Sequence, residues 1–304
     1  MTLSADVRSA LLALLASAVL SFIDNFVALV AEEAGVWQFQ VFRALMAIPI
    51  LVLIGRVFGQ SLRPKKFKNL AMRSVTVAIG LLMYFASLGV LPVAQAGAGL
   101  FSAPIWVLLF SAVLFGVRIT ALQFSLIGAG FTGVLLLLQP DLATLTALSV
   151  LPLVAGAFYG LGMLLTPQLC GDESPALLAI GVFASIGCIS LVMLIYFSMM
   201  PVESPTFLTA GWTVPTSRFM GLTLFQAIGA VVAVMAIAQA YRIGQSAFVA
   251  VVEYSFLIFA CIWSFLLWNT TTNLVGLLGI GIIVVSGCLL VFAQSGKAKD
   301  TATS

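Results

Sequence analysis

Long apolar runs are the feature that most constrains this chain, because each is about as long as a helix that crosses a lipid bilayer. Such a helix needs roughly 20 apolar residues, at a rise of about 1.5 Å per residue, to cross about 30 Å of hydrocarbon. Only 8% of the residues are charged and 62% are hydrophobic, whereas charged residues make up roughly a quarter of a soluble domain. The sequence therefore predicts an all-α polytopic membrane protein.

The breaks between the apolar runs are short and carry turn-forming or polar residues, so the runs predict ten separate transmembrane helices. We place them at about residues 9–31, 36–57, 70–91, 94–116, 119–138, 150–168, 176–200, 218–241, 245–268 and 273–293. The first run follows Arg8, as in a secretory signal. It continues to about Ala31, however, so we interpret it as a retained membrane helix.

A basic stretch at residues 56–73 predicts the orientation of the chain. It holds Arg56, Arg63, Lys65, Lys66, Lys68 and Arg73. Lys and Arg accumulate in short cytoplasmic loops, so we expect both termini in the cytoplasm and a short cytoplasmic tail at residues 297–304. The expected location is the bacterial cytoplasmic (inner) membrane, crossed several times. The net charge of +3 reflects these loops and does not indicate a nucleic-acid partner.

Five predicted helices precede the break at Pro140 and five follow it. Repeats at residues 1–140 and 141–296 would therefore enter the membrane in opposite orientations. An offset of 152 residues aligns four identical pairs: Ala86 with Ala238, Ala98 with Ala250, Leu114 with Leu266 and Thr120 with Thr272. Inverted repeats are common in secondary carriers, whose substrate site lies near the midplane between the halves. We therefore predict two inverted five-helix repeats.

Three polar residues, Asp24, Asn25 and Arg43, fall inside the first two predicted helices. Polar groups in hydrocarbon are costly and point by default to a pathway or a site. Asp24 and Arg43 lie at similar depth on adjacent antiparallel helices, so the sequence allows them to pair. One interpretation is a buried ion pair that fixes the helix register. The alternative is a pair that opens for a zwitterion, with Arg43 taking its carboxylate and Asp24 its ammonium group.

A second polar position is Glu253-Tyr254, about eight residues into the ninth predicted helix. The chain contains no His, so proton coupling near neutral pH would depend on carboxylates such as Glu253 or Asp24. Coupling or substrate recognition is one interpretation of this position. A neutral, hydrogen-bonded carboxyl group that only packs against its neighbours is the other.

Aromatic residues within the predicted helices are candidates for lining a cavity, because aromatic walls suit organic cations and amphipathic solutes. Tyr84, Trp106 and Tyr159 are the candidates in the helix interiors, whereas Trp37, Tyr241 and Trp268 near helix ends are more simply interface anchors. Pro104, inside the fourth predicted helix, would free a backbone carbonyl and is a candidate hinge.

Several functional classes lack the motifs they require. The chain has no His, no HExxH and no GxSxG, so we predict no enzyme activity, no catalytic residues and no metal site. The chain lacks the GxxxxGK[ST] loop that would indicate an ATP-driven pump, and we predict no cofactor. Four well-separated cysteines without CxxC spacing are interpreted as packing residues. A passive channel stays as an alternative to a carrier.

The chain also resembles the EamA-type transporters of the drug/metabolite transporter superfamily over about residues 9–294. The resemblance is carried by the ten short-looped helices and by Phe42-Arg43, Ala86-Ser87-Leu88, Pro92-Val93-Ala94, Ser102-Ala103-Pro104 and Val252-Glu253. It implies a metabolite carrier of the cytoplasmic membrane, often an exporter, whose cavity is lined by helices other than the fifth and tenth.

Together these features predict a secondary transporter that moves a small organic metabolite by alternating access, as an exporter or exchanger. An amino acid or related zwitterion is the favoured substrate because of Asp24 and Arg43. The alternatives are an uptake carrier for a vitamin-like or cationic aromatic solute, and a passive channel. The expected partners are the small-molecule substrate and the lipid bilayer. Proton or ion coupling, and a monomer or homodimer, are left open.

Overall fold

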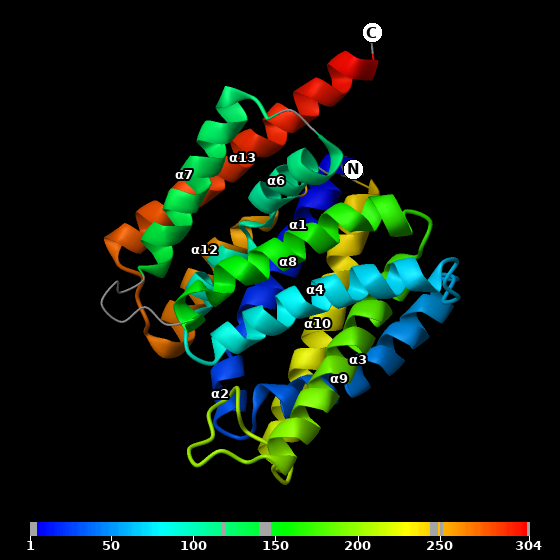
Figure 1. The fold of residues 1–304 in the computed structure, drawn as a ribbon, viewed down its shortest axis with the longest axis vertical. Coiled ribbons are helices and arrows are strands. Elements are labelled where there is room, and N and C mark those ends of the chain that lie inside the picture. Colours follow the sequence, from blue (N-terminus) through cyan, green and yellow to red (C-terminus); the bar gives the residue numbers. More distant parts are fainter. Residues whose placement is uncertain (1–4, 117–118, 140–146, 244–248, 250–251, 303–304) are drawn as a thin grey trace.

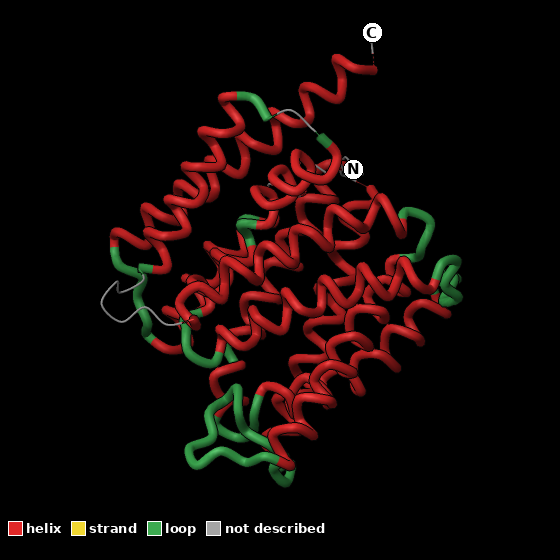
Figure 2. Tube along the Cα trace, viewed as in Figure 1, coloured by secondary structure: helices red, strands yellow, loops and turns green. Residues whose placement is uncertain are grey.

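The computed structural model describes residues 5–116, 119–139, 147–243, 249 and 252–302, which are helical and contain no strand (Figure 2). The helices are α1 (Ala5–Asp24), α2 (Val27–Ala31), α3 (Val36–Val57), α4 (Phe67–Leu88), α5 (Val93–Leu100), α6 (Ala103–Phe115), α7 (Ala121–Leu138), α8 (Ala147–Cys170), α9 (Pro175–Met199), α10 (Ser217–Ile243), α12 (Ser255–Trp268) and α13 (Leu274–Ala302). Each predicted span up to residue 241 corresponds to one helix or to one broken pair, and α12 and α13 correspond to the last two spans.

Seven segments of the described chain are long and apolar enough to cross a membrane, and two of these combine successive helices. They are Val7–Ala31, Val36–Val57, Phe67–Leu88, Val93–Phe115, Val150–Cys170, Pro175–Met199 and Ser217–Ala240. Three shorter apolar helices, Ala121–Leu137, Ser255–Trp268 and Leu274–Leu289, complete the set. The prediction of an all-helical, multi-pass membrane protein is therefore confirmed.

Three predicted spans are interrupted, at Tyr254 in the span at 245–268 and in two earlier spans, which corrects their description as single helices. The span at 9–31 breaks at Asn25 and Phe26, and the span at 94–116 breaks at Phe101 and Ser102. The second break has two local causes. The Ser102 hydroxyl donates to the Gly99 carbonyl at 2.6 Å, a local bond that competes with helix. Pro104, in the first turn of α6, has no N–H group to continue the hydrogen-bond ladder of α5.

The end of the chain also differs from its expected form. Residues 297–302 of the predicted cytoplasmic tail continue α13 as helix up to Ala302. Figure 1 shows that α1 begins and α13 ends on the same side of the bundle as the turn between α3 and α4. Both described chain ends therefore lie at one end of the bundle, as an even number of crossings requires.

The second half of the described chain repeats details of the first. Ser102 precedes α6 and Tyr254 precedes α12, at the offset of 152 residues found in the sequence. The residues that cap α6 and α12, Gly116 and Asn269, both have left-handed backbone conformations, with φ of 66° and 54°. Two helices of similar length therefore start after a break and stop in the same way.

Helix contacts also occur in equivalent pairs when each helix is replaced by its counterpart in the other half. α4 packs along α8 as α10 packs along α1, and α4 contacts α9 as α10 contacts α3. The pairs α3 with α9 and α7 with α13 link the halves directly (Figure 1). This pairing is consistent with two inverted repeats. The domain boundary at residues 140 and 141 lies outside the described residues, so the division stays a prediction.

Contacts between the halves fasten both ends of the bundle. At one, the Glu32 end, the Arg218 guanidinium donates to Glu33 Oε1 at 3.0 Å and to Glu32 Oε2 at 3.1 Å. Thr216 donates to Glu33 Oε2 at 2.6 Å. The turn before α3 is thus tied to the start of α10, and the connection from α9 to α10 also contacts it, with Trp37 donating to the Leu208 carbonyl at 2.7 Å.

The opposite end, the Lys65 end, has a corresponding contact. There the second half supplies the carboxylates and the first half supplies the basic residue. The turn between α8 and α9 supplies the carboxylates there. Glu173 accepts from the Lys65 amide at 2.8 Å, and Asp172 lies 3.9 Å from the Lys65 ammonium group. The acidic turn 32–33 therefore contacts the connection after α9, and the acidic turn 172–173 contacts the connection after α3. The two contacts lie at opposite ends of the bundle.

We predict that Gly156→Ala destabilises the protein, whereas Gly128→Ala does not. A methyl group at Gly156 would meet the backbone of Gly99, where α8 and α5 touch, whereas one at Gly128 on α7 would meet nothing within 4 Å. Overpacking costs about 1–3 kcal/mol, and an unobstructed Gly→Ala change in a helix gains about 0.5–1 kcal/mol. Melting temperatures of the detergent-purified proteins measure both effects. A drop of equal size in the two variants would contradict this account.

We also predict that the contact at the Glu32 end weakens in acid. The hydrogen bond from Thr216, followed by the bond and charge of Arg218, lowers the pKa of Glu33 from its usual range. A lowered pKa in the folded state stabilises the contact above the usual carboxylate pKa, and this contribution is lost as the pH falls through the lowered value. Hydrogen exchange of residues 206–216 should therefore accelerate in that window. Glu33→Gln should exchange faster at neutral pH and lose this pH dependence.

Candidate functional site

The break between α1 and α2 places a carboxylate inside the bundle. Asp24 is the last residue of α1 and is only 4% exposed. The Tyr84 hydroxyl, from α4, donates to its Oδ2 atom at 2.6 Å. The other carboxylate oxygen, Oδ1, is buried without a hydrogen-bond partner in the structure. One oxygen is therefore held in place, and the other is available to a donor.

Asn25, next in the chain, joins the break to the second half. Its side-chain nitrogen donates to the Ser21 carbonyl at 2.7 Å, and its oxygen accepts from the Ser264 hydroxyl on α12 at 2.9 Å. Gln226 on α10 donates to the Ile23 carbonyl, which also accepts from the Phe26 amide within the turn. Side chains of α10 and α12 thus hydrogen-bond to the residues on either side of the break.

A cavity of about 410 Å³ leads from the Glu32 end to this break. Its lining comes from α1 and α2, from the turn between α4 and α5, and from the end of α12. The residues are Asp24, Asn25, Ala28, Leu29, Glu32, Leu88, Gly89, Val90, Leu91, Pro92, Val93, Ser264, Trp268 and Thr270. The wall is mostly apolar, with polar groups at the floor and mouth, which is typical of small-molecule sites.

Arg43 does not form the ion pair with Asp24 that the sequence allowed. Among the described side chains no salt bridge joins the two, although their charges still interact. The Arg43 guanidinium instead lies 4.4 Å from the centre of the Phe85 ring and 5.8 Å from those of Phe39 and Phe183. Aromatic faces attract cations, so these rings provide the contact that the carboxylate was expected to give.

Several polar atoms deep in the helices near Arg43 have no hydrogen-bond partner in the structure. They are Arg43 Nε, both amide atoms of Gln40, Ser190 Oγ, Thr223 Oγ1 and Gln226 Oε1, on helices α3, α9 and α10. Buried polar atoms are almost always paired with protein or ordered water. These atoms lie on α3, α9 and α10, and none of them belongs to the lining of the cavity at Asp24.

Glu253 and Tyr254 lie at the other half's break. The Ser17 hydroxyl donates to the Glu253 backbone carbonyl at 3.5 Å, which ties this break to α1. The charge of Glu253 interacts with Tyr159 on α8. Tyr254 is 2% exposed and its hydroxyl lies against Gly287 of α13. Neither Glu253 nor Tyr254 lines the cavity at Asp24.

The remaining aromatic candidates are not at the cavity. Trp106 on α6 packs against the rings of Phe110 and Phe131, at 5.9 and 5.4 Å, and donates to Ser102 Oγ at 3.2 Å. Tyr159 packs among the apolar side chains around α4. The side chain of Pro104 lies outside the described residues, so its role as a hinge stays a prediction. The structure thus brings together only Asp24, Asn25 and Tyr84 of the predicted site residues.

Sequence reasoning missed four polar or aromatic lining residues: Glu32, Ser264, Trp268 and Thr270. Glu32 falls in the predicted connection between the first two spans, and Trp268 was interpreted as an interface anchor. A signal was available for both. Glu32 follows the predicted span that holds Asp24, and Trp268 ends the predicted span that holds Glu253. No periodic pattern marks Ser264, which becomes significant only through its hydrogen bond to Asn25.

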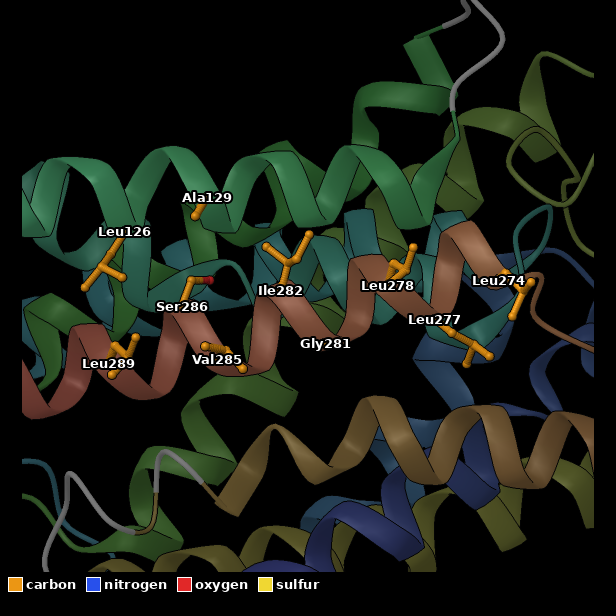
Figure 3. A pocket seen from close by; sticks show the side chains of 10 residues that line it. All are labelled: Leu126, Ala129, Leu274, Leu277, Leu278, Gly281, Ile282, Val285, Ser286 and Leu289. Atoms are coloured by element: carbon orange, nitrogen blue, oxygen red, sulfur yellow. The ribbon is translucent and has the colours of Figure 1, made fainter.

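A larger pocket, of about 630 Å³, lies between α7 and α13 (Figure 3). Its side chains are apolar except for Ser286, and they include Leu126, Leu278 and Val285. Several of them are strongly exposed, as expected for helices that face lipid. This pocket offers no charge and little hydrogen bonding, so we assign the site to the cavity at Asp24.

Searching the described residues finds no group of His, Cys, Asp and Glu arranged to hold a metal ion. The four cysteines are unpaired.

The chain is similar to known transporters. The model of the EamA-like transporter family matches residues 7–139. A riboflavin transporter of Rhizobium johnstonii is 27% identical over 219 residues, which cover 72% of this chain and 67% of that protein. The pseudopaline exporter CntI of Pseudomonas aeruginosa is 24% identical over 281 residues, which cover 92% of this chain and 94% of that protein.

A solved crystal structure shares the fold. It superposes with a TM-score of 0.65 at 13% sequence identity, over 96% of this chain and 99% of its own. The likeness therefore extends through both halves of the described bundle.

We predict that Tyr84→Phe destabilises the protein and that Tyr196→Phe does not. The Tyr84 hydroxyl is the hydrogen-bond donor to the buried Asp24, and a bond to a charged group contributes about 1.5–3 kcal/mol. Tyr196 is 52% exposed and serves as the matched control. Melting temperatures measure the difference. Equal melting temperatures for the two variants would contradict the importance of this bond.

Proposed function

We propose that this chain is an EamA-like secondary carrier whose substrate binds in the cavity at Asp24, because the family model matches residues 7–139 and transporter relatives match most of the chain. It is a membrane transporter of small molecules and not an enzyme. The observation that supports the site best is the unpartnered Oδ1 atom of Asp24, which is buried at a helix break and reached by a cavity. Discontinuous helices with polar groups near the midplane are how many carriers build substrate sites.

Alternating access fits the contacts between the halves. The cavity opens at the Glu32 end, which the basic stretch predicts to be the outside. Passage to the Lys65 end requires the halves to move against each other, because Glu173 and Ser174 join them there by hydrogen bonds to Lys65 and Ser61. We propose that the halves rock about the Asp24 break, in the bacterial cytoplasmic membrane, with both termini inside.

The substrate we favour is a small organic metabolite, and two classes remain. An amino acid or related zwitterion would use Asp24 and would need Arg43 to move from its aromatic rings. A vitamin-like solute is the second candidate, supported by similarity to a riboflavin transporter. Similarity to a pseudopaline exporter supports export over uptake.

Glu253 is our candidate for coupling to protons or ions. It stands at the break before α12, where its backbone carbonyl accepts from Ser17 of α1 and its charge interacts with Tyr159. A carboxylate at a helix break within a crossing is a typical proton carrier. Exchange by a monomer or by a homodimer fits this mechanism equally.

Counterflow in proteoliposomes tests the carrier proposal. Vesicles preloaded with a mixture of amino acids, or with riboflavin, should take up the labelled compound by a saturable process that the unlabelled compound inhibits. Linear flux without inhibition would indicate a channel, and absence of counterflow with either load would reject both substrate classes.

The same assay tests the residues. Asp24→Asn, Arg43→Ala and Glu253→Gln should each lower the initial rate about tenfold or more, the effect of about 1.4 kcal/mol. Glu203→Gln in the exposed connection between α9 and α10 is the control for loss of one negative charge. If the three site variants insert normally and transport at the native rate, the site assignment is wrong.

A further inference from the structure

The cavity at Asp24 has the electrostatic character of a cation site. We propose that it recognises the positively charged group of its substrate through Asp24 and discriminates against anions. This inference rests on the proposed function and specifies the substrate class of the same cavity.

Charged side chains give the first argument. Two carboxylates line the cavity, Asp24 at the floor and Glu32 at the mouth, and no Lys or Arg is among the lining residues. Glu32 is already paired with Arg218 at 3.1 Å. Asp24 has no ion-pair partner among the described side chains, and its buried Oδ1 atom has no donor. The floor therefore presents a negative charge that no protein cation contacts.

Helix ends give the second argument. The last residues of three helices line the cavity, namely Asp24 of α1, Leu88 of α4 and Trp268 of α12. The carboxyl end of a helix carries a partial negative charge from its unpaired carbonyl groups. Two helix starts oppose them with a partial positive charge, at Val93 of α5 and at the first turn of the five-residue α2, which contributes Ala28. The balance adds to the negative potential of Asp24.

The nearest cations do not cancel this potential. Arg218 is engaged by Glu32 and Glu33 at the surface. Arg43 interacts with Asp24 only through its charge, and its guanidinium faces the Phe85 ring. An ammonium group entering the cavity would therefore make the direct contact with Asp24 that neither arginine makes. Trp268 and the apolar wall would cover the uncharged part of the solute.

Tyr84 is the positioning residue in this scheme. Its hydroxyl fixes Oδ2, so that Oδ1 is the oxygen left for the substrate. A charge-assisted hydrogen bond to this oxygen is about twice as strong as a neutral one. An anion would instead face Asp24 without a compensating cation.

A charge-matched series of ligands tests the inference directly. 2-Phenylethylamine, phenylalanine and 3-phenylpropionate share one ring and differ in carrying a cationic, a zwitterionic or an anionic end. Calorimetric titration of the native protein in lipid nanodiscs should show 2-phenylethylamine binding about tenfold or more tightly than 3-phenylpropionate. Phenylalanine should bind more weakly than the amine, because its carboxylate adds repulsion.

Variants locate the source of the preference. Asp24→Asn keeps the shape of the side chain and should remove the difference between amine and acid, whereas Glu203→Gln should retain it. Absence of 2-phenylethylamine binding, equal or tighter binding of the acid, or an unchanged preference in Asp24→Asn would each overturn the inference. Each of these results leaves the carrier proposal standing, because counterflow of amino acids or riboflavin does not depend on the charge preference. The comparison of the three ligands on the native protein remains decisive even if Asp24→Asn fails to fold.

Discussion

The constraint on which the structure depends is the requirement that backbone polar groups be hydrogen-bonded inside the hydrocarbon layer. A continuous helix meets it without help, and a broken helix does not. The break after Asp24 keeps backbone bonds of its own, from Asn25 to Phe22 and from Phe26 to Ile23, and two side-chain donors, Gln226 and Ser264, bond to the Ile23 carbonyl and to the Asn25 side chain. These donors come from the second half of the chain. The break is therefore a property of the assembled bundle, and it places a carboxylate where a cavity can reach it.

The positions of the breaks explain why the peripheral helices are so different from the central ones. α7 and α13 pack along each other at the edge of the bundle in Figure 1, and the pocket they line is apolar. Crossings that contribute side chains to Asp24 are instead interrupted or end close to it, as α12 does at Trp268. At Asp24, polar side chains and an irregular backbone therefore occur together, whereas the edge helices α7 and α13 line an apolar pocket.

Much of the fold was predictable from sequence, because apolar length alone separates membrane helices from loops. The span at 36–57 matches α3, and the span at 176–200 differs from α9 by one residue at each end. The breaks at Asn25 and Ser102 were not predicted, because hydropathy is continuous across them and their causes are specific hydrogen bonds. Pro104 was recognised as unusual, but its place in the first turn of α6 depends on where α5 stops.

The site was predicted only in part, for a similar reason. Burial of Asp24 and Asn25 follows from their neighbours, but pairing is a matter of geometry. Depth along the helices favoured Arg43 as the partner of Asp24, whereas the side-chain directions select Tyr84. The rings around Arg43 come from three helices, and their convergence on one guanidinium leaves no pattern in the sequence.

The two acidic turns, 32–33 and 172–173, carry a consequence for the resting protein. Each turn joins one end of its half to the opposite half, so in the rocking movement proposed above the two contacts would oppose each other. Which end is open in the substrate-free protein would then depend on the difference between these two surface attractions, not on the strength of either alone. Salt screens both charge contacts, so the balance between the two ends depends on the ionic strength around the protein.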